Sequence, residues 1–283
     1  MRIVTQTDTL GRRLGDKAAV EIIARAGFGG IDYSMFPMND PKSPLLGDEM
    51  PAIIDELKET AARYSIPFTQ AHAPFPSMRK DNEDYNKFIF TSIVRSMEIA
   101  GRLGVENIVV HPISLSPFGT DFDLNYRFYQ RLVPYIDEYG VRVCTENMFG
   151  HQDGRHTPSA CASPADFRQL NDMLGTERFG ACLDLGHCGL VGFKANELIR
   201  ALGPEHLVAL HTHDNDFNSD MHIFPFNGRI DWADTMHALH EIGYRGNLTF
   251  EADNSLRSCP DSFLPVAERH LHDIGLALMD MMK

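Results

Sequence analysis

Side chains that can ligate metals or transfer protons follow the ends of short apolar runs throughout this 283-residue sequence. One His, Asp or Glu at such a position is usually a loop cap or an ordinary hydrogen-bonding group. Eight of them recur here, each within a few residues of the end of an apolar run, and this repetition predicts a shared site. They are His72, His111, Glu146, Asp184, His187, His211, His213 and Glu251.

Four of these side chains form a mixed set of oxygen and nitrogen donors: Glu146, Asp184, His211 and Glu251. Such a set suits Mn²⁺, which we favour, as well as Mg²⁺, Co²⁺ or Zn²⁺. A dication stabilises negative charge developing on a neighbouring carbonyl oxygen, and a carboxylate beside it can move a proton. The predicted chemistry is therefore removal of a proton from a carbon next to a carbonyl group.

The remaining histidines have other expected roles. For His72 and His111, contact with a substrate and ligation of a metal are equally compatible with the sequence. His151 and His156 lie in GHQDGRHT, which we interpret as a mobile loop. We expect surface or packing roles for the others, which are His206, His237, His240, His270 and His272.

Elements that could position these residues alternate regularly along the chain. Apolar runs typical of strands cover residues 2–7, 30–35, 67–73, 107–112, 141–147, 179–185, 207–213 and 247–252. Amphipathic stretches typical of helices cover 16–26, 48–64, 83–103, 124–139, 164–174, 196–202, 232–242 and 262–282. Strand followed by helix, repeated eight times, predicts an α/β fold consisting of one (β/α)8 TIM barrel over residues 1–283. A doubly wound sheet is disfavoured because no GxGxxG follows the first strand.

A barrel of this kind explains why the polar residues follow the strands. The carboxyl ends of parallel strands form one rim, where different strands each contribute residues to a site. Side chains two residues apart point to the same side of a strand. If Asp184 and Glu251 point into the barrel, Cys182 and Thr249 do so as well, and Cys144 accompanies Glu146. Loop aromatics that could wall a pocket at this rim are Phe36, Phe75, Phe118, Phe149 and Phe226.

Composition excludes several classes of protein. Lys and Arg number 26 against 39 Asp and Glu, a formal charge of −13, which disfavours binding along a nucleic acid backbone. No stretch is long and apolar enough to predict a membrane span, and the first residues lack the apolar core of a signal peptide. We therefore expect a cytoplasmic location.

Several motifs together resemble the xylose isomerase-like TIM-barrel superfamily, which includes the sugar phosphate isomerase/epimerase family. They are AHAPF at 71–75, VVHP at 109–112, TEN at 145–147, LDLGH at 183–187, HTHDND at 211–216, SDMH at 219–222, GRIDW at 228–232 and LTFEAD at 248–253. One departure is PFNG at 225–228, where P-G-x-G is usual in the superfamily. This difference bears on the details of the substrate loop.

The resemblance to ketose epimerases implies one divalent metal ion held by Glu146, Asp184, His211 and Glu251. It also implies that Glu146 and Glu251 are the catalytic pair, transferring protons on opposite faces of a substrate carbon. Substrate contacts are then expected from His72, His111, His187 and His222. The resemblance to endonuclease IV instead implies a three-zinc cluster held by His72, His111, Glu146, Asp184, His187, His211, Asp220, His222 and Glu251. Asp220 and His213 are candidate additional metal ligands.

We favour the small-molecule branch because of the acidic net charge, the IFPFNGRIDW stretch and the scarcity of Lys and Arg in the loops after the strands. The expected enzyme is a metal-dependent isomerase or epimerase of a keto-sugar, sugar phosphate or polyol derivative, working through an enediolate that the metal stabilises. The alternatives are a dehydratase or lyase on a related sugar or cyclitol, and a multi-zinc phosphodiester hydrolase. The expected partner is a small sugar-like substrate, without nucleic acid or membrane, and the resemblance is compatible with a homo-oligomer.

Overall fold

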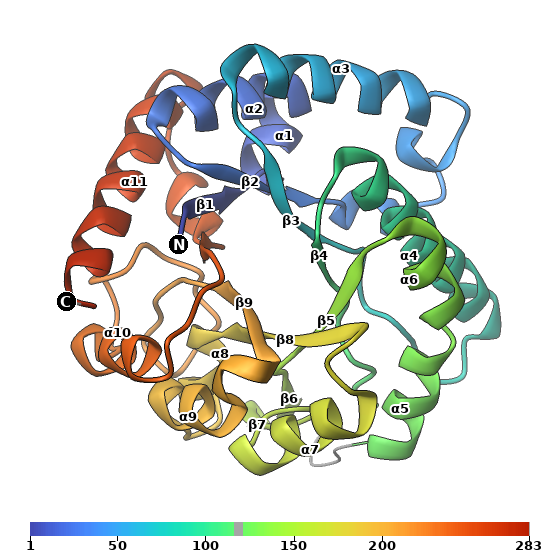
Figure 1. The fold of residues 1–283 in the computed structure, drawn as a ribbon, viewed down its shortest axis with the longest axis vertical. Helices are drawn as coiled ribbons and strands as arrows, with labels where there is room; N and C mark the ends of the chain where they lie inside the picture. Colours follow the sequence, from blue (N-terminus) through green and yellow to red (C-terminus); the bar gives the residue numbers. More distant parts are fainter. Residues whose placement is uncertain (116–120, 283) are drawn as a thin grey trace.

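Eight parallel strands form a barrel in the computed structural model, which describes residues 1–115 and 121–282 (Figure 1). Their order is β10-β1-β2-β3-β4-β5-β8-β9. The ring is completed where the Thr212 amide donates to the Thr249 carbonyl (2.8 Å) and the Glu251 amide donates to the Thr212 carbonyl (3.2 Å). The strands are β1 (Ile3–Gln6), β2 (Gly30–Ser34), β3 (Phe68–His72), β4 (Asn107–Val109), β5 (Arg142–Glu146), β8 (Phe179–Asp184), β9 (Leu207–His211) and β10 (Leu248–Phe250). The α/β TIM-barrel prediction is confirmed, and each strand lies within its predicted range.

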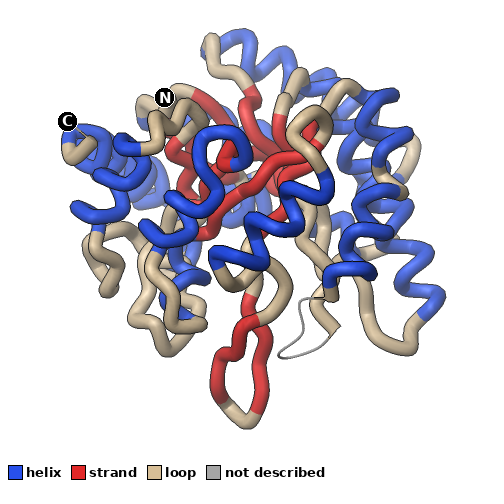
Figure 2. Tube along the Cα trace, turned by 60° about the horizontal axis from the view of Figure 1, so that its bottom comes forward, coloured by secondary structure: helices blue, strands red, loops and turns tan. Residues whose placement is uncertain are grey.

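Helices surround the barrel on its outside (Figures 1 and 2). They are α1 (Asp8–Leu14), α2 (Asp16–Ala26), α3 (Met50–Tyr64), α4 (Glu83–Leu103), α5 (Phe122–Gln130), α6 (Val133–Tyr139), α7 (Pro164–Leu174), α8 (Leu185–Leu190), α9 (Ala195–His206), α10 (Trp232–Glu241) and α11 (Leu264–Asp280). Short 3₁₀ turns lie at Phe36–Asn39, Pro44–Leu46, Asp253–Leu256 and Asp261–Phe263. Among the helices described, none has both the length and the apolar character to cross a membrane.

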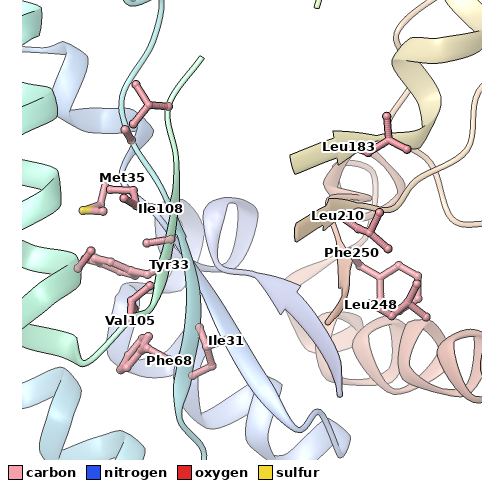
Figure 3. Close-up of a cluster of buried hydrophobic side chains, with 14 of the residues drawn as sticks. Ile31, Tyr33, Met35, Phe68, Val105, Ile108, Leu183, Leu210, Leu248 and Phe250 are labelled. Carbon is pink, nitrogen blue, oxygen red and sulfur yellow. The ribbon is translucent and has the colours of Figure 1, made fainter. Parts of the chain in front are cut away.

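Two layers of buried side chains follow from strand alternation. On β2, Ile31 and Tyr33 belong to the large apolar layer between the strands and the helices, together with residues such as Leu183 and Leu210 (Figure 3). A separate small cluster, consisting of Val109, Cys144, Cys182 and Ala209, is also fully buried. Cys144 and Cys182 therefore alternate with the outer-layer residues, as the strand pattern predicted for inward-facing positions.

Two sequence predictions were wrong in detail. The predicted helix 124–139 is two helices, α5 and α6, because Pro134 has no amide hydrogen to donate to the preceding turn. The predicted mobile loop GHQDGRHT is instead a β-hairpin, in which β6 (Phe149–Gln152) pairs with β7 (Arg155–Pro158) and projects from the body of the molecule (Figure 2). Its two-residue turn, Asp153 and Gly154, has φ of 51° and 75°, as a tight hairpin turn requires.

Two short helices, α1 and α8, were not predicted at all. Each begins directly after a barrel strand, so each takes the chain away from the rim where the polar residues gather. At the start of α8, the Asp184 side chain accepts a hydrogen bond from the backbone amide of His187 (2.8 Å). Asp184 is therefore the N-terminal cap of this helix.

Candidate metal centre

The barrel brings most of the predicted site residues to one rim. His72, Glu146, Asp184 and His211 are the last residues of β3, β5, β8 and β9, and Glu251 directly follows β10. These five side chains come from different strands, and their residues are 0–8% exposed. Burying so many polar groups is unfavourable unless each has a partner, so the contacts among them are informative.

Glu146, Asp184, His211 and Glu251 form the central group. Each offers one ligand atom, and the four atoms lie within 4.8 Å of one another. The Nδ1 atom of His211 is 2.8 Å from Glu146 Oε1 and 3.2 Å from Glu251 Oε2. His211 Nδ1 therefore faces the two glutamates, at the place where a shared cation would be bound.

A second group consists of Asp184, His187, His213 and His222, and it shares Asp184 with the central group. His213 Nε2 lies 2.9 Å and 3.0 Å from the two carboxylate oxygens of Asp184. Asp220 adjoins this group, with one oxygen 3.1 Å from His222 Nε2 and 3.7 Å from His187 Nε2. Of the additional candidate ligands, His213 thus belongs to the second group, and Asp220 contacts two of its histidines.

On the other side of the central group, His72 and His111 approach Glu146. Glu146 Oε2 is 2.9 Å from His111 Nε2 and 3.6 Å from His72 Nε2. Phe36 packs edge-on against His72, and Phe75 stacks on His111 with ring centroids 4.6 Å apart. Both histidines therefore lie between a carboxylate and an aromatic wall.

Three of these histidines have one ring nitrogen held by the backbone. His72, His187 and His222 each place Nδ1 within 2.8–2.9 Å of a backbone carbonyl oxygen, at Ala73, Asn147 and Glu251 respectively. Since a carbonyl only accepts, Nδ1 donates, and Nε2 is directed toward the carboxylates. This arrangement is characteristic of metal-ligating imidazoles.

Proximity of the imidazoles keeps the carboxylates ionised. Burial raises the pKa of Glu146, but His211 and His111 outweigh this effect and hold the pKa well below its usual range. Burial is likewise outweighed at Asp184, where His187 and His213 lower the pKa to about 2. Burial lowers the pKa of His222, but the neighbouring carboxylates of Asp220 and Glu251 outweigh this effect and raise the pKa to about 9.

The donors of the central group fit a divalent metal ion. Three buried carboxylates and one buried imidazole converge there, with ligand atoms within 4.8 Å of one another. Buried polar atoms are normally paired, and a charge-dense cluster of this composition matches dications that accept oxygen and nitrogen ligands. Glu146, Asp184, His211 and Glu251 are therefore the residues that could hold such an ion.

Two supporting residues were not recognised from the sequence. Asp32, at the middle of β2, places Oδ2 3.8 Å from His211 Nε2 and accepts a hydrogen bond from Gln70 (2.9 Å). Asn147 binds both the backbone of Asp184 and, through its carbonyl, the ring of His187. Alternation along 30–34 could have identified Asp32 as inward-facing, and Asn147 lies in the TEN motif without a role assigned to it.

A cavity of about 700 Å³ opens beside the central group. Its wall includes Asp220, His222, Glu251, Phe36 and Phe75. Glu146 is not part of the wall that the described residues form, and it lies deeper in the barrel. Glu251 is thus the member of the predicted catalytic pair that borders the cavity.

The other loop aromatics are placed differently. Phe149 belongs to β6, and its ring lies against the His187 ring with centroids 4.9 Å apart. Phe226 is largely exposed and packs on Trp232, away from the cavity wall. Phe118 lies outside the described residues.

A family model for the xylose isomerase-like TIM barrel matches residues 20–271. The chain belongs to the xylose isomerase-like TIM barrel family. The match covers strands β2 to β10 and therefore all the residues of the central group. The family resemblance predicted from the motifs is thus confirmed.

Known proteins similar to this family member include an uncharacterized protein, MJ1311, from Methanocaldococcus jannaschii, 26% identical over 72% of this chain and 70% of that protein. Among solved structures, a D-tagatose 3-epimerase-like protein superimposes with a TM-score of 0.77, at 21% identity, over 99% of this chain and 98% of the other. The IOLI protein with a bound zinc atom gives a TM-score of 0.78, at 17% identity, over 100% and 99% of the two chains. At these identities, the structural likeness is one of fold.

Proposed function

We propose that this chain is a divalent-metal-dependent isomerase or epimerase of a small keto-sugar, sugar phosphate or polyol derivative. The observation that carries the proposal is the position of Glu251, which borders the cavity while one of its oxygens is 3.2 Å from the metal-facing nitrogen of His211. A carboxylate in this position is within reach of both a cavity-bound molecule and the ligand cluster. The named function of the D-tagatose 3-epimerase-like protein supports the same class of reaction.

The metal would be held by Glu146, Asp184, His211 and Glu251, whose donor atoms already lie within 4.8 Å of one another. When bound, the ion supplies positive charge that stabilises an oxyanion formed from the substrate carbonyl. The zinc atom in the similarly folded IOLI protein is compatible with this assignment. The mixed donor set favours Mn²⁺ and also accepts Mg²⁺, Co²⁺ or Zn²⁺.

Proton transfer is assigned to the two glutamates. Glu251, at the cavity wall, removes the proton from the carbon next to the carbonyl, and the electron pair of that C–H bond moves to the carbonyl oxygen to give an enediolate. Glu146 is assigned to the opposite face of the same carbon, where its carboxylic acid form returns a proton to the enediolate carbon and the C–H bond forms again. His222, which also borders the cavity, and His187 beside it are placed to hold substrate hydroxyl groups.

Turnover of a panel of keto-sugars by the Mn²⁺-loaded protein tests this assignment. Glu146→Gln and Glu251→Gln remove the proton-transferring carboxylates with little change in side-chain size. We expect each variant to lose about 10²–10⁴-fold in kcat, as is typical when a general base is removed. Glu83→Gln, at an exposed position on α4, is the matched control and should keep full activity. Full turnover by both site variants would exclude the mechanism.

The same site chemistry also permits elimination, so a dehydratase or lyase acting on a related sugar or cyclitol is a close alternative. In that case, the proton would be removed as above, and the adjacent hydroxyl or glycosyl group would leave. Products lacking one water, or split at a C–O or C–C bond, would identify this reaction in the same panel.

A multi-zinc phosphodiester hydrolase is the second candidate function. The observation that favours it is the overlap of three ligand groups, with His72, His187 and His222 all presenting Nε2 toward carboxylates. The acidic net charge of −13 speaks against a polyanionic nucleic acid substrate. Metal content separates the two: about one ion per chain supports the isomerase, and three supports the hydrolase.

A further inference from the structure

The wall of the cavity beside the candidate metal centre also carries arginines. Besides Asp220, His222 and Glu251, this wall includes Arg12, on α1, and Arg257, in the segment after β10. These two elements are distant in sequence and meet at this wall. A molecule held by its carbonyl end near Glu251 would therefore extend toward the two guanidinium groups.

Arg12 and Arg257 are available for a ligand, unlike their neighbour Arg13. Arg13 is engaged by the Leu256 and Cys259 carbonyls and by Asp261, which ties α1 to the segment 256–261. Arg12 uses its Nε to bind Asp8 (2.6 Å), and its side chain remains 52% exposed. Arg257 is exposed and, within the residues described, forms no ion pair with any carboxylate.

Two of the acids on this wall, Asp8 and Asp253, already have partners. Asp8 is the partner of Arg12, so this pair is close to neutral. Asp253 is turned toward α1, where its carboxylate accepts the backbone amide of Thr9. Of the three arginines on this wall, Arg257 is therefore the one that has no carboxylate within ion-pair distance among the described residues.

We propose that the substrate carries an anionic group, a carboxylate or a phosphate, at the end of the molecule remote from the reacting carbonyl, and that Arg257 and Arg12 bind this group. Guanidinium groups bind both anions through paired N–H donors. The inference rests on the proposed function for the position of the carbonyl end. It narrows the substrate to acidic sugars or sugar phosphates and makes Arg257 a specificity-determining residue.

Binding of non-reacting analogues tests this assignment without relying on catalysis. Sorbitol, gluconate and sorbitol 6-phosphate have six carbons and no aldehyde or ketone group, and they differ in the group at one end. Calorimetry on the Mn²⁺-loaded full chain should show at least about tenfold tighter binding of one anionic analogue than of sorbitol, since a charge-assisted hydrogen bond contributes about 1.5–3 kcal/mol. The anion that binds more tightly identifies whether a carboxylate or a phosphate is preferred.

Variants assign the preference to the two arginines. Arg257→Gln should weaken binding of the preferred anion about tenfold and leave sorbitol binding unchanged, and Arg12→Gln should do so to a smaller extent because Asp8 already neutralises Arg12. Arg102→Gln, on the outer surface of α4, is the matched control and should change nothing. Equal affinity for the three analogues in the unmodified chain, or an anion preference that survives the Arg12→Gln/Arg257→Gln double variant, would overturn the inference.

This experiment separates the inference from the proposed function. Arginine-dependent anion binding in a protein that turns over no keto-sugar would support the anion site and contradict the isomerase proposal. Turnover of neutral keto-sugars without any preference for their acidic counterparts would support the isomerase proposal and contradict the anion site.

Discussion

His213 holds Asp184 through a single ring nitrogen, with Nε2 2.9 Å and 3.0 Å from the two carboxylate oxygens. Both residues are fully buried, and the His213 ring stacks on His222 at 3.8 Å between centroids. Asp184 belongs to both the central and the second ligand group. The orientation of His213 therefore determines how the Asp184 carboxylate is presented to both groups.

Gly186 provides the space that the His213 ring occupies. A Cβ on Gly186 would overlap this ring, and no flexible chain end is available to move aside. Gly186→Ala should therefore displace His213 and lower the free energy of unfolding by about 1–3 kcal/mol, as expected for overpacking. Chemical denaturation measures the change, and a Cβ at Gly47 makes only an ordinary contact, so Gly47→Ala is the control.

A double variant distinguishes this specific overlap from a general perturbation of α8. Removing the ring in Gly186→Ala/His213→Ala should make the alanine at 186 less destabilising than it is beside His213. If Gly186→Ala lowers the free energy of unfolding by the same amount with and without the His213 ring, overlap with the ring does not cause the loss of stability.

Asp32 lies on the side of the His211 ring away from the two glutamates and faces Nε2 at 3.8 Å. We expect it to fix the ring so that Nδ1 points to the metal. Asp32→Asn should weaken Mn²⁺ or Zn²⁺ binding about 10–100-fold, the usual cost of losing a carboxylate behind a ligating histidine. Competition with a chelator measures the dissociation constant, with Asp84→Asn as an exposed control. Unchanged affinity would show that His211 is oriented by other contacts.

Glu268 is fully buried on α11, and neither of its carboxylate oxygens has a hydrogen-bond partner. Burial, with a smaller contribution from Asp253, raises the pKa of Glu268 well above the ordinary value of 4.5 for a glutamate carboxyl group. The folded chain thus binds this proton more tightly than the unfolded chain does. The resulting stabilisation is present below pH 4.5, declines as pH rises, and is lost above the folded-state pKa.

Glu268→Gln should remove this pH dependence. The variant should gain stability relative to the unmodified chain as pH rises from about 4 to 8, by about 1.4 kcal/mol for each unit of the pKa difference. Denaturation at several pH values measures this gain, and Glu83→Gln should show none. A difference in stability that stays constant with pH would mean that Glu268 titrates normally.

Metal removal should affect stability because folding brings like charges together in the central group. Chelation should lower the melting temperature, and adding back Mn²⁺ or Zn²⁺ should restore it, since a ligand that binds only the folded state stabilises it. Asp184→Asn should make the melting temperature much less sensitive to metal. An identical melting temperature with and without metal for the unmodified chain would argue against a resident ion.

Much of the barrel was predictable from the sequence because strand and helix periods are local signals. The strands 68–72 and 179–184 are short apolar runs, and α4 is a long amphipathic stretch that ends before Gly104, whose φ of 74° suits a C-terminal cap. The hairpin at 149–158 was missed because its residues are polar, so only the Asp153–Gly154 pair indicated a turn. The short helix α8 was missed because its first residue, Leu185, was assigned to the predicted strand 179–185.

The candidate site was predictable only to the level of residues, not contacts. Strand ends placed Glu146, Asp184, His211 and Glu251 together, since parallel strands end at one rim. That His213 would bind Asp184, or that Asp32 would face His211, depends on side-chain directions across strands far apart in sequence. The assignment of individual ligand and substrate roles, and of residues 1–283 to one domain, stays a prediction.

Hydrogen exchange at the substrate carbon tests the central claim most directly. The Mn²⁺-loaded protein, incubated in D₂O with the keto-sugar or acidic keto-sugar that it turns over best, should introduce deuterium from the solvent at the carbon next to the carbonyl. Glu251→Gln should abolish this exchange, and Glu83→Gln should leave it unchanged. Turnover without deuterium at that carbon, or hydrolysis of a phosphodiester with no exchange into any keto-sugar, would contradict the account.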